Sequence, residues 1–367
     1  MKIPFVDLKA QYQSIREEIH LAIQGVLEES AFILGPRLEA FEHDFAKFCN
    51  APYCACVGSG TDALYLALKA MGVGSGDEVV TVAHTYIATT EAISFTGAKP
   101  VFVDVEPDTM LMDVDKIEAA ITRKTKTILP VHLYGQICDM DRILAIARKH
   151  RLQVLEDCAQ GHAAEFNGKR SPICPVAAFS FYPGKNLGAY GDAGAVVTHN
   201  RKIHKYILQQ RDHGRVKGAK YEHAHLGFGF RMDTIQAAIL HVKLNHLEDW
   251  TEKRRQHAAH YTRRLKGVVT TPVELPGRRH VWHIYPIRTK KRDDLRKHLE
   301  TAGVSANIHY PIPVHLQPAY RFLKVRRGKL PVTERCAKEL LSLPMYPDLT
   351  PEQVDYVCDR VIEFLRE

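Results

Sequence analysis

Apolar residues recur at helical spacing in two segments near the start of the chain. One stripe runs from Leu38 through Phe41 and Phe45, and this spacing of three or four predicts an amphipathic helix with a buried aromatic face. A second stripe predicts a helix over residues 61–71, which the glycines of residues 72–76 then end. Both helices are therefore expected to pack an apolar face against a core.

Short apolar runs alternate with helical segments up to about residue 200. Such runs predict buried strands, and a helix over residues 141–150 lies between two of them. Helices between short apolar strands are typical of a mostly parallel sheet covered on both faces, so the predicted fold class is α/β. The predicted strands are residues 78–82, 101–103, 128–132, 154–156, 178–181 and 195–198.

The pattern changes in the last third of the chain. After a helix predicted over residues 233–245, a separate charged helix over residues 246–265 leads into strand-like segments and proline-rich loops. We therefore predict a large domain over residues 1–245 and a smaller α+β domain over residues 246–367. The arm of residues 1–15 is assigned to the large domain, with packing on the small domain as the alternative.

The composition of the 367 residues is that of a globular protein, with 45% hydrophobic and 25% charged residues. The longest apolar runs are far shorter than the roughly 20 residues of a membrane-spanning helix, and residues 1–7 lack the apolar core of a signal peptide. We therefore expect no membrane contact and a cytoplasmic location. The eight cysteines are sparse and irregularly spaced, so free thiols and no metal site are expected, with Cys54 and Cys56 in the core.

The net charge is +8 with neutral histidines, and basic runs are concentrated in the last third of the chain. Runs such as Arg254-Arg255 and residues 290–292 are interpreted as solvated helix faces or loops. Nucleic-acid binding is not expected, since neither a recognisable module nor interleaved aromatic residues accompany these runs. An anionic small substrate suits the same charge.

Candidate chemistry follows the predicted strands, because parallel sheets bind ligands beyond the carboxyl ends of their strands. Residues 58–62 read Gly-Ser-Gly-Thr-Asp and open a predicted helix. Free backbone N–H groups and the helix dipole at such a turn suit one phosphate group. On its own, however, the turn is better explained as an ordinary helix cap.

Three further side chains stand just after predicted strands. Asp157 ends a largely apolar strand, where a buried carboxylate needs a cation; a protonated heterocyclic nitrogen, an arginine or a helix N-terminus would serve. Lys185 lies in a Pro-Gly turn; such lysines are usually on the surface, but beside apolar strands the pKa can fall enough for an amine nucleophile. Tyr86 is placed either to stack on a planar ring or to lie in the core.

Together these features supply a phosphate binder, a stacking ring, a counter-charge for a ring nitrogen and an amine, which is the set that pyridoxal 5'-phosphate requires. The chain resembles the DegT/DnrJ/EryC1/StrS sugar aminotransferases, which are fold type I enzymes dependent on this cofactor, and the resemblance extends nearly end to end. The segments that carry it are residues 4–8, 33–36, 58–63, 76–79, 133–135, 156–160, 180–194, 231–233, 236–238 and 309–313.

The resemblance implies roles for particular residues. Lys185 would form the Schiff base with the cofactor, and Asp157 would pair with its pyridinium nitrogen, so these two residues would carry catalysis. The other implied cofactor contacts are Gly60, Thr61 and Ser180 at the phosphate, Tyr86 stacked on the ring, and Gln160 near O3′.

The resemblance also implies a homodimer with shared active sites, in which residues 227–231 reach in from the other subunit. Gly229 stands where relatives usually carry an asparagine that touches the phosphate, so this donor is missing here. Arg231, His309 and Tyr310 match positions that relatives use around the sugar nucleotide.

The implied reaction transfers an amino group from L-glutamate to a nucleotide-linked ketosugar. The residues around Lys185 are more similar to members acting on 3-keto sugars, so we predict amination at C3 of a dTDP- or UDP-linked sugar. A C4 sugar aminotransferase remains an alternative. A non-catalytic regulatory protein on the same fold is the other, because a fold does not dictate activity.

Overall fold

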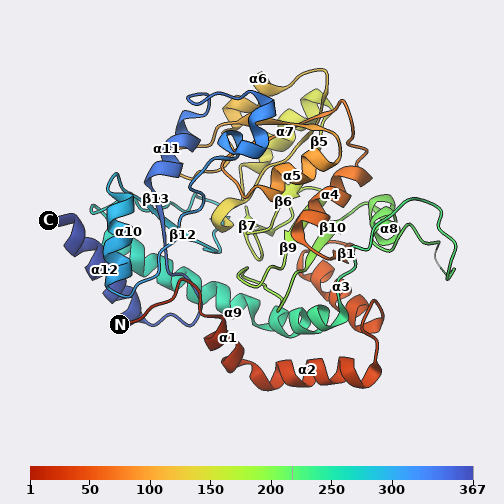
Figure 1. The fold of residues 1–367 in the computed structure, drawn as a ribbon, viewed down its shortest axis with the longest axis horizontal. Helices are drawn as coiled ribbons and strands as arrows, with labels where there is room; N and C mark the ends of the chain where they lie inside the picture. Colours follow the sequence, from red (N-terminus) through yellow and green to blue (C-terminus); the bar gives the residue numbers. More distant parts are fainter. Residues whose placement is uncertain (217, 367) are drawn as a thin grey trace.

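The computed structural model describes residues 1–216 and 218–366, and its ribbon shows a sheet flanked by helices (Figure 1). The α-helices are α1 (Leu8–Ser14), α2 (Arg16–Glu29), α3 (Pro36–Phe48), α4 (Gly60–Ala70), α5 (Ala88–Phe95), α6 (Ile117–Ala120), α7 (Met140–His150), α8 (Arg201–Gln210), α9 (Thr234–Leu265), α10 (Arg292–Thr301), α11 (Pro331–Glu339) and α12 (Pro351–Arg366). The strands are β1 (Tyr53–Val57), β2 (Glu78–Val82), β3 (Lys99–Val103), β4 (Thr125–Ile128), β5 (Gln153–Val154), β6 (Glu156–Asp157), β7 (Glu165–Phe166), β8 (Lys169–Arg170), β9 (Val176–Ser180), β10 (Gly194–Thr198), β11 (Arg278–Arg279), β12 (Tyr285–Arg288) and β13 (Leu340–Leu343).

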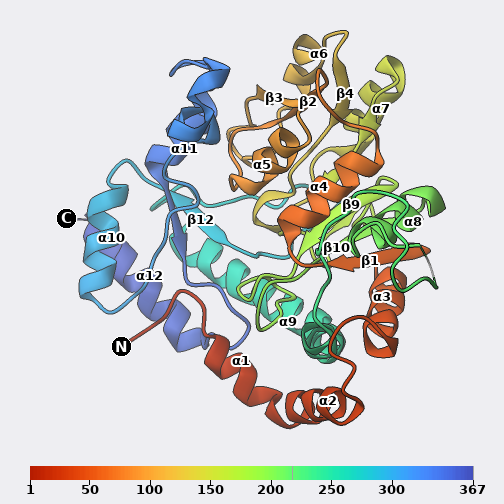
Figure 2. The ribbon, with the colours of Figure 1, turned by 45° about the vertical axis from the view of Figure 1, so that its right-hand side comes forward.

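The main sheet has two four-stranded parts. One part has the order β3-β2-β4-β5 with all neighbours parallel, and the other has the order β1-β10-β9-β6. In the second part β6 and β9 are parallel, whereas β10 is antiparallel to both of its neighbours. The two parts are joined where β5, the last strand of the first part, continues almost directly into β6 of the second. Beyond the end of β4, Val131 also pairs with Asp157 of β6. The predicted mostly parallel sheet is confirmed (Figure 2).

Helices α3 and α4 cover opposite faces of this sheet. Successive side chains of a strand point to opposite faces, and Phe179 of β9 packs edge-on against Phe45 of α3 at a centroid distance of 5.1 Å. The next residue, Ser180, instead lies against Gly60 at the start of α4. The aromatic stripe predicted for α3 is confirmed, since Phe41 and Phe45 are both fully buried.

Helix α9 is continuous over 32 residues, so the prediction of two helices meeting at residue 245 was wrong. Buried residues recur along it without a break, including Leu244, Leu247 and Thr251, and this keeps the helix intact through its charged part. Leu247 belongs to the main core, whereas Tyr261 and Leu265 belong to a second core. The division predicted after residue 245 therefore falls inside a helix that serves both cores.

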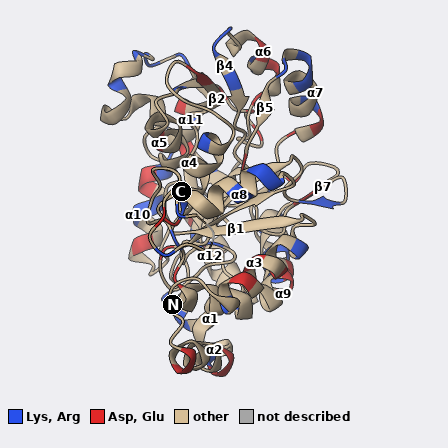
Figure 3. Cartoon of the chain, turned by 90° about the vertical axis from the view of Figure 1, so that its right-hand side faces the viewer, with Lys and Arg blue, Asp and Glu red and all other residues tan. Residues whose placement is uncertain are grey.

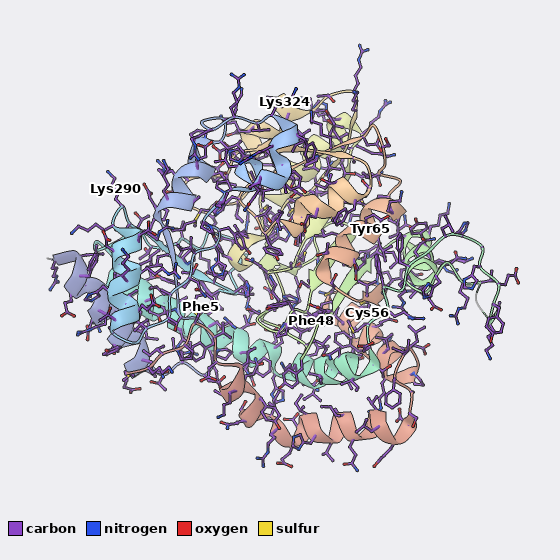
Figure 4. The ribbon with its side chains drawn as sticks, viewed as in Figure 1. Phe5, Phe48, Cys56, Tyr65, Lys290 and Lys324 are labelled. Carbon is purple, nitrogen blue, oxygen red and sulfur yellow. The ribbon has the colours of Figure 1, made fainter. Side chains whose placement is uncertain are left out.

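The first residues of the chain lie against the C-terminal part. Ile3 is buried in the second core, its N–H donates to the carbonyl of Gly303 (2.9 Å), and its own carbonyl accepts from Ser305 N (2.9 Å). The ring of Phe5, marked in Figure 4, stacks on that of His309 at 5.4 Å. Figure 1 accordingly shows the N-terminal segment beside α12.

Two of the predicted strands differ in detail from the observed ones. The run predicted as residues 128–132 is largely beyond the strand: β4 ends at Ile128, and Pro130, which has no N–H to donate, lies just after it. The run predicted as residues 154–156 is divided between β5 and β6, because Gln153–Val154 pairs with β4 and Glu156–Asp157 pairs with β9.

The cysteines lie where the sequence predicts them. The eight cysteines are free and buried, and Cys56 lies within β1 in the body of the molecule (Figure 4). Figure 3 shows both signs of charge on the peripheral helices, while β1 carries none. None of the described helices has the length and apolar character needed to cross a bilayer.

The interpretation of the basic runs as solvated was wrong at two positions. Arg254 is 3% exposed and donates to the carbonyls of Trp282 (3.3 Å) and Met345 (2.8 Å). Arg292 is buried as well, and it donates to the carbonyl of Leu340 (3.0 Å). Both guanidinium groups therefore have a structural role, because they donate hydrogen bonds to backbone carbonyl groups in the interior.

Candidate active site

Asp157 ends β6 at the carboxyl end of the sheet and is 4% exposed. Its Oδ2 accepts from the hydroxyl of Thr89 (2.8 Å), and its Oδ1 accepts from the N–H of Ala159 (3.1 Å). Burial raises the pKa of Asp157, while these two donors and the positive charge of Lys185 act in the opposite direction. The carboxylate is therefore held in place but is short of a full counter-charge.

Lys185 lies in the loop between β9 and β10, and the loop's own hydrogen bonds shape it. The N–H of Lys185 donates to Tyr182 O (2.8 Å), and a Cβ at Gly188 would lie 2.3 Å from the carbonyl oxygen of Pro183, so only glycine fits there. Burial lowers the pKa of Lys185 to about 8, against the opposing charge of Asp157. Lys185 and Asp157 thus lie close enough for each charge to shift the pKa of the other.

The start of α4 forms a compact turn with free backbone donors. Ser59 caps the helix, its hydroxyl accepting from Asp62 N (3.1 Å). Within the described residues, the N–H groups of Gly60 and Thr61 have no hydrogen-bond partner. A Cβ at Gly60 would lie 2.6 Å from the Cβ of Ser180, so this turn lies directly against the end of β9. The structure therefore brings the three predicted phosphate contacts together.

Tyr310 lies near Asp157 and contacts both Gln160 and Tyr86. The Gln160 side chain accepts from Tyr134 N (2.6 Å) and donates to Tyr310 OH (3.4 Å), which fixes its amide. The Tyr310 ring lies 5.8 Å from that of Tyr86, and 58% of Tyr86 is exposed. Burial and the nearby charge of Asp157 raise the pKa of Tyr310. Tyr86 is thus an open ring beside the pocket rather than a core residue.

His309 also lies near Lys185. Its Nδ1 hydrogen-bonds Ser342 Oγ (2.9 Å), and burial, followed by the charge of Lys185, lowers its pKa to about 4. The carbonyl of His309 accepts from the hydroxyl of Tyr134. His309 is therefore a neutral imidazole anchored in the C-terminal part of the chain and close to the lysine.

Arg231 lies beside the glycine-rich turn, but its side chain is engaged elsewhere. The adjacent carbonyl of Phe230 accepts from Gly58 N (2.8 Å), while the Arg231 guanidinium donates to Asp212 (2.8 Å). A Cβ at Gly229 would lie 3.3 Å from Cε1 of His213, so a histidine ring stands next to that position. Unlike the other predicted site residues, Arg231 has its charge already paired within its own chain.

Sequence reasoning did not identify Thr89 and left the place of His162 open. Thr89 binds Asp157 from 68 positions away, and nothing in its local sequence signals this. His162 is fully buried, neither ring nitrogen has a partner among the described residues, and burial together with the Lys185 charge lowers its pKa to about 3. Its position two residues after Gln160 was the only available signal.

Three metal-ligand side chains, His132, Glu156 and Cys158, lie together in the described core. His132 Nε2 and Glu156 Oε2 are 2.7 Å apart, and His132 Nδ1 accepts from Cys138 N (3.3 Å). Glu156 Oε1 accepts from Ile173 N (2.7 Å). Since both ring nitrogens and both carboxylate oxygens already have partners, we interpret this cluster as a hydrogen-bonded core group.

The structure has a lysine in a loop at the carboxyl ends of a mostly parallel sheet, near a buried aspartate. This arrangement is the one expected for fold type I enzymes, the class that the resemblance implies. The chain matches the sequence model of the DegT/DnrJ/EryC1/StrS aminotransferase family over residues 13–362, and it belongs to that family. The predicted family is therefore confirmed.

Curated relatives match the chain over nearly its whole length. The "Pleiotropic regulatory protein" of Geobacillus stearothermophilus is 47% identical over 100% of this chain and 99% of its own. The "dTDP-3-amino-3,4,6-trideoxy-alpha-D-glucose transaminase" of Streptomyces venezuelae is 44% identical over 99% of this chain and 96% of its own. The "UDP-2-acetamido-2-deoxy-3-oxo-D-glucuronate aminotransferase" of Pseudomonas aeruginosa is 42% identical over 97% and 98%.

Solved structures agree with these relatives. The crystal structure of S. venezuelae DesV in complex with a ketimine intermediate superposes with a TM-score of 0.98 at 44% identity, covering 100% of this chain and 99% of that one. The fold type I architecture predicted from the resemblance is therefore confirmed.

Proposed function

We propose that this chain is a pyridoxal 5'-phosphate-dependent aminotransferase that moves an amino group from L-glutamate to C3 of a nucleotide-linked ketosugar. The observation that carries the proposal is the placement of Lys185, in the loop after β9, near Asp157 at the end of β6, where the charge of each shifts the pKa of the other. A lowered lysine pKa beside a buried carboxylate is an arrangement suited to amine chemistry.

The residues present fit this cofactor. Asp157 is buried with two neutral donors, Thr89 and Ala159 N, so it favours a protonated ring nitrogen as its missing cation. The free N–H groups of Gly60 and Thr61 stand at a helix N-terminus, which suits a phosphate, and Ser180 lies directly against them. When bound, pyridoxal 5'-phosphate supplies an aldehyde for the amino group and an electron-withdrawing ring.

The side chains of this chain then divide the work. Lys185, with a pKa of about 8, keeps a usable fraction of neutral amine near neutral pH, so its Nζ can attack a carbonyl carbon and can later take up or return a proton. Asp157 is fixed before reaction and stabilises positive charge opposite it. Gln160 is oriented by Tyr134 and Tyr310, and its amide would contact the O3′ region of the bound cofactor.

The substrate side of the proposal rests on the C-terminal residues of the pocket and on the relatives. His309 packs against Tyr310, and Tyr310 lies beside the exposed ring of Tyr86, which a sugar could reach from solvent. Both transaminase relatives carry a name that refers to position 3 of the sugar, one dTDP-linked and one UDP-linked. These names support C3 amination and leave dTDP and UDP as the carriers to test.

We also propose a homodimer with shared active sites. The loop that follows α8 projects from the body at the right of Figure 1. It exposes two large apolar side chains, Tyr221 at 81% and Leu226 at 98%. Apolar side chains on a projecting loop favour contact with a second subunit, and Arg231 at the base of this loop is our candidate for contact with the sugar nucleotide.

One observation favours a second candidate function. The Geobacillus stearothermophilus relative is named a regulatory protein, and Gly229 removes a side-chain donor, so a non-catalytic regulator on the same fold is the rival. The complete set of Lys185, Asp157 and Gln160 supports the enzyme instead, as does the cap at Ser59. A C4 sugar aminotransferase is the rival within the enzyme class.

The decisive experiment is a spectrum of the purified protein with pyridoxal 5'-phosphate, followed by addition of L-glutamate and then of dTDP- and UDP-linked 3-keto and 4-keto sugars. We expect visible absorbance that borohydride abolishes, loss of that absorbance with glutamate, and its return with a 3-keto sugar only. Lys185→Ala is the matched control and should show none of these changes. Wild-type protein that leaves glutamate unchanged would favour the regulatory candidate.

A further inference from the structure

Asn186, the neighbour of Lys185, is buried and is bonded at both ends of its amide to the C-terminal part of the chain. Its Nδ2 donates to the carbonyl of Val281 (3.0 Å), and its Oδ1 lies 3.2 Å from Nδ1 of His283. A carbonyl only accepts hydrogen bonds, so Nδ2 must face Val281 and Oδ1 must face the imidazole. His283 therefore donates from a protonated Nδ1.

The surroundings of His283 keep this imidazole neutral. Burial lowers the pKa of His283 well below its usual value, and the positive charges of Lys185 and Arg254 and the nearby His309 act in the same direction. A neutral ring that is protonated on Nδ1 has a bare Nε2. The hydrogen-bond pattern thus fixes the tautomer as well as the orientation.

The backbone around His283 is held just as firmly. Val281 N donates to Gly135 O (3.0 Å), and His283 N donates to Tyr134 O (2.9 Å). Gly135 has φ +105°, and a Cβ there would lie 2.7 Å from Val281 Cγ2 and 3.2 Å from His283 N. The close approach of the two segments therefore requires glycine at position 135.

Helix α9 supports the same segment from the other side. Arg254 donates to Trp282 O (3.3 Å), and Arg255 donates to His280 O (2.9 Å). Residues 280–283 therefore connect α9, which spans both cores, with the loop that carries Lys185. A shift of this segment would be passed to Asn186 through two hydrogen bonds.

We propose that His283 is a positioning residue for Lys185: by donating from Nδ1 to Asn186, it fixes the loop, at the residue next to Lys185, to the C-terminal part of the chain. A second anchor lies two residues further along the loop, where Lys243 Nζ donates to Gly188 O (2.7 Å). Loss of the His283 bond would therefore free the part of the loop next to Lys185 while the remainder stays in place. This inference deepens the proposed function and rests on it.

The physical consequence concerns where the Lys185 amine stands. In the proposed reaction this amine leaves its carbon partner, moves a proton and returns in every cycle. Rate falls steeply when a reacting group is displaced by about 1 Å, by roughly 100-fold. A loop held through Asn186 keeps the Lys185 amine close to its carbon partner when the two are not bonded. His283 therefore influences the rate without touching the reacting atoms.

The test compares His283→Leu, which removes the donor, with His283→Asn, whose side-chain amide places a donor near the former Nδ1. His257→Leu is the matched control, because His257 is a half-buried histidine with one bond, to Pro347 O (3.2 Å), away from this segment. Hydrogen exchange over residues 182–190 of the cofactor-free protein and the single-turnover rate with glutamate are both measured.

We expect His283→Leu to raise exchange in residues 182–190 about tenfold and to slow the single turnover about tenfold or more, as expected for a displaced amine. His283→Asn should recover most of both, and His257→Leu should match wild type. Asn186→Leu removes the same bond and also the bond to Val281 O, so the double variant should be no worse than Asn186→Leu alone. If His283→Leu does not fold, the exchange and turnover of Asn186→Leu are compared with those of His283→Asn instead.

Exchange and turnover in His283→Leu within twofold of wild type would overturn the inference, as would a failure of His283→Asn to restore them. Failure of the proposed function looks different: wild-type protein would then give no borohydride-sensitive absorbance at all. The exchange measurement on cofactor-free protein still tests the His283 anchor in that case.

Discussion

Gly60 and Ser180 approach so closely that a Cβ at position 60 would lie 2.6 Å from the Cβ of Ser180. The contact joins the first residue of α4 to the last residue of β9. Gly194 extends it, because a Cβ there would lie 2.3 Å from the carbonyl oxygen of Ser59. The proposed phosphate cup is therefore made by backbone packing that only glycines permit.

Gly60→Ala should weaken cofactor binding. The added methyl group forces α4 away from β9, and overpacking of this kind typically costs about 1–3 kcal/mol, which corresponds to a loss of affinity of roughly tenfold or more. A titration of the cofactor-free protein with pyridoxal 5'-phosphate measures it. Gly74→Ala is the control, since a Cβ there meets nothing closer than 4.0 Å. Equal affinities for the two variants would contradict the backbone cup.

Thr89→Val should shift the pH dependence of turnover. The Thr89 hydroxyl stabilises ionised Asp157, so its loss raises the Asp157 pKa, and the ionised form is then lost at a higher pH as the solution is acidified. A hydrogen bond to a charged group is worth about 1.5–3 kcal/mol, so the acid limb should move up by roughly one to two pH units. Thr90→Val, which loses only a bond to Ile87 O, should leave the profile unchanged.

Most of the α/β architecture could be predicted because its signals are local. The stripe of α3 and the apolar runs of the strands are set by neighbours in sequence. The continuity of α9 could not be predicted in this way. Its second half is charged on several faces, and only the packing of Leu247, Thr251 and Tyr261 in the folded chain shows that one helix crosses the expected boundary.

The residues of the candidate site also differ in whether local sequence could predict them. Lys185 and Asp157 each stand just after a predicted strand, so the rule that ligands bind at carboxyl ends of parallel strands was enough to select them. His309 and Tyr310 were selected only through the family resemblance. Thr89 and His283 were missed because their partners lie 68 and 97 positions away, and no local pattern encodes such pairings.

Cofactor capture should depend on pH through Lys185. The neutral amine is the nucleophile, and with a pKa of about 8 its fraction rises about tenfold per pH unit up to that value and then levels off. Stopped-flow mixing of cofactor-free protein with pyridoxal 5'-phosphate between pH 6 and 10 measures this. Asp157→Asn removes the charge that opposes the lowered pKa, so its plateau should begin at a lower pH. A rate still rising at pH 10 would contradict the lowered pKa of Lys185.

The cofactor-free protein should lose stability in acid partly because of His162. Burial holds the pKa of His162 at about 3, whereas an unfolded histidine has a pKa near 6.5, so below pH 6.5 the unfolded chain binds a proton that the folded chain refuses. Folding stability contributed by this group is therefore complete above pH 6.5 and falls as the pH drops toward 3. Each unbalanced proton costs about 1.4 kcal/mol per pH unit.

His162→Phe should make the acid dependence shallower by about that slope, because phenylalanine suits the neighbouring rings of Phe179 and Phe181 and cannot be protonated. Urea denaturation at pH 7, 6, 5 and 4 measures the free energy of unfolding at each pH. His43→Phe is the control, since His43 is an exposed histidine on α3. Parallel curves for wild type and His162→Phe would show that His162 is protonated equally in the folded and unfolded chains. We expect otherwise, because neither ring nitrogen of His162 has a partner among the described residues.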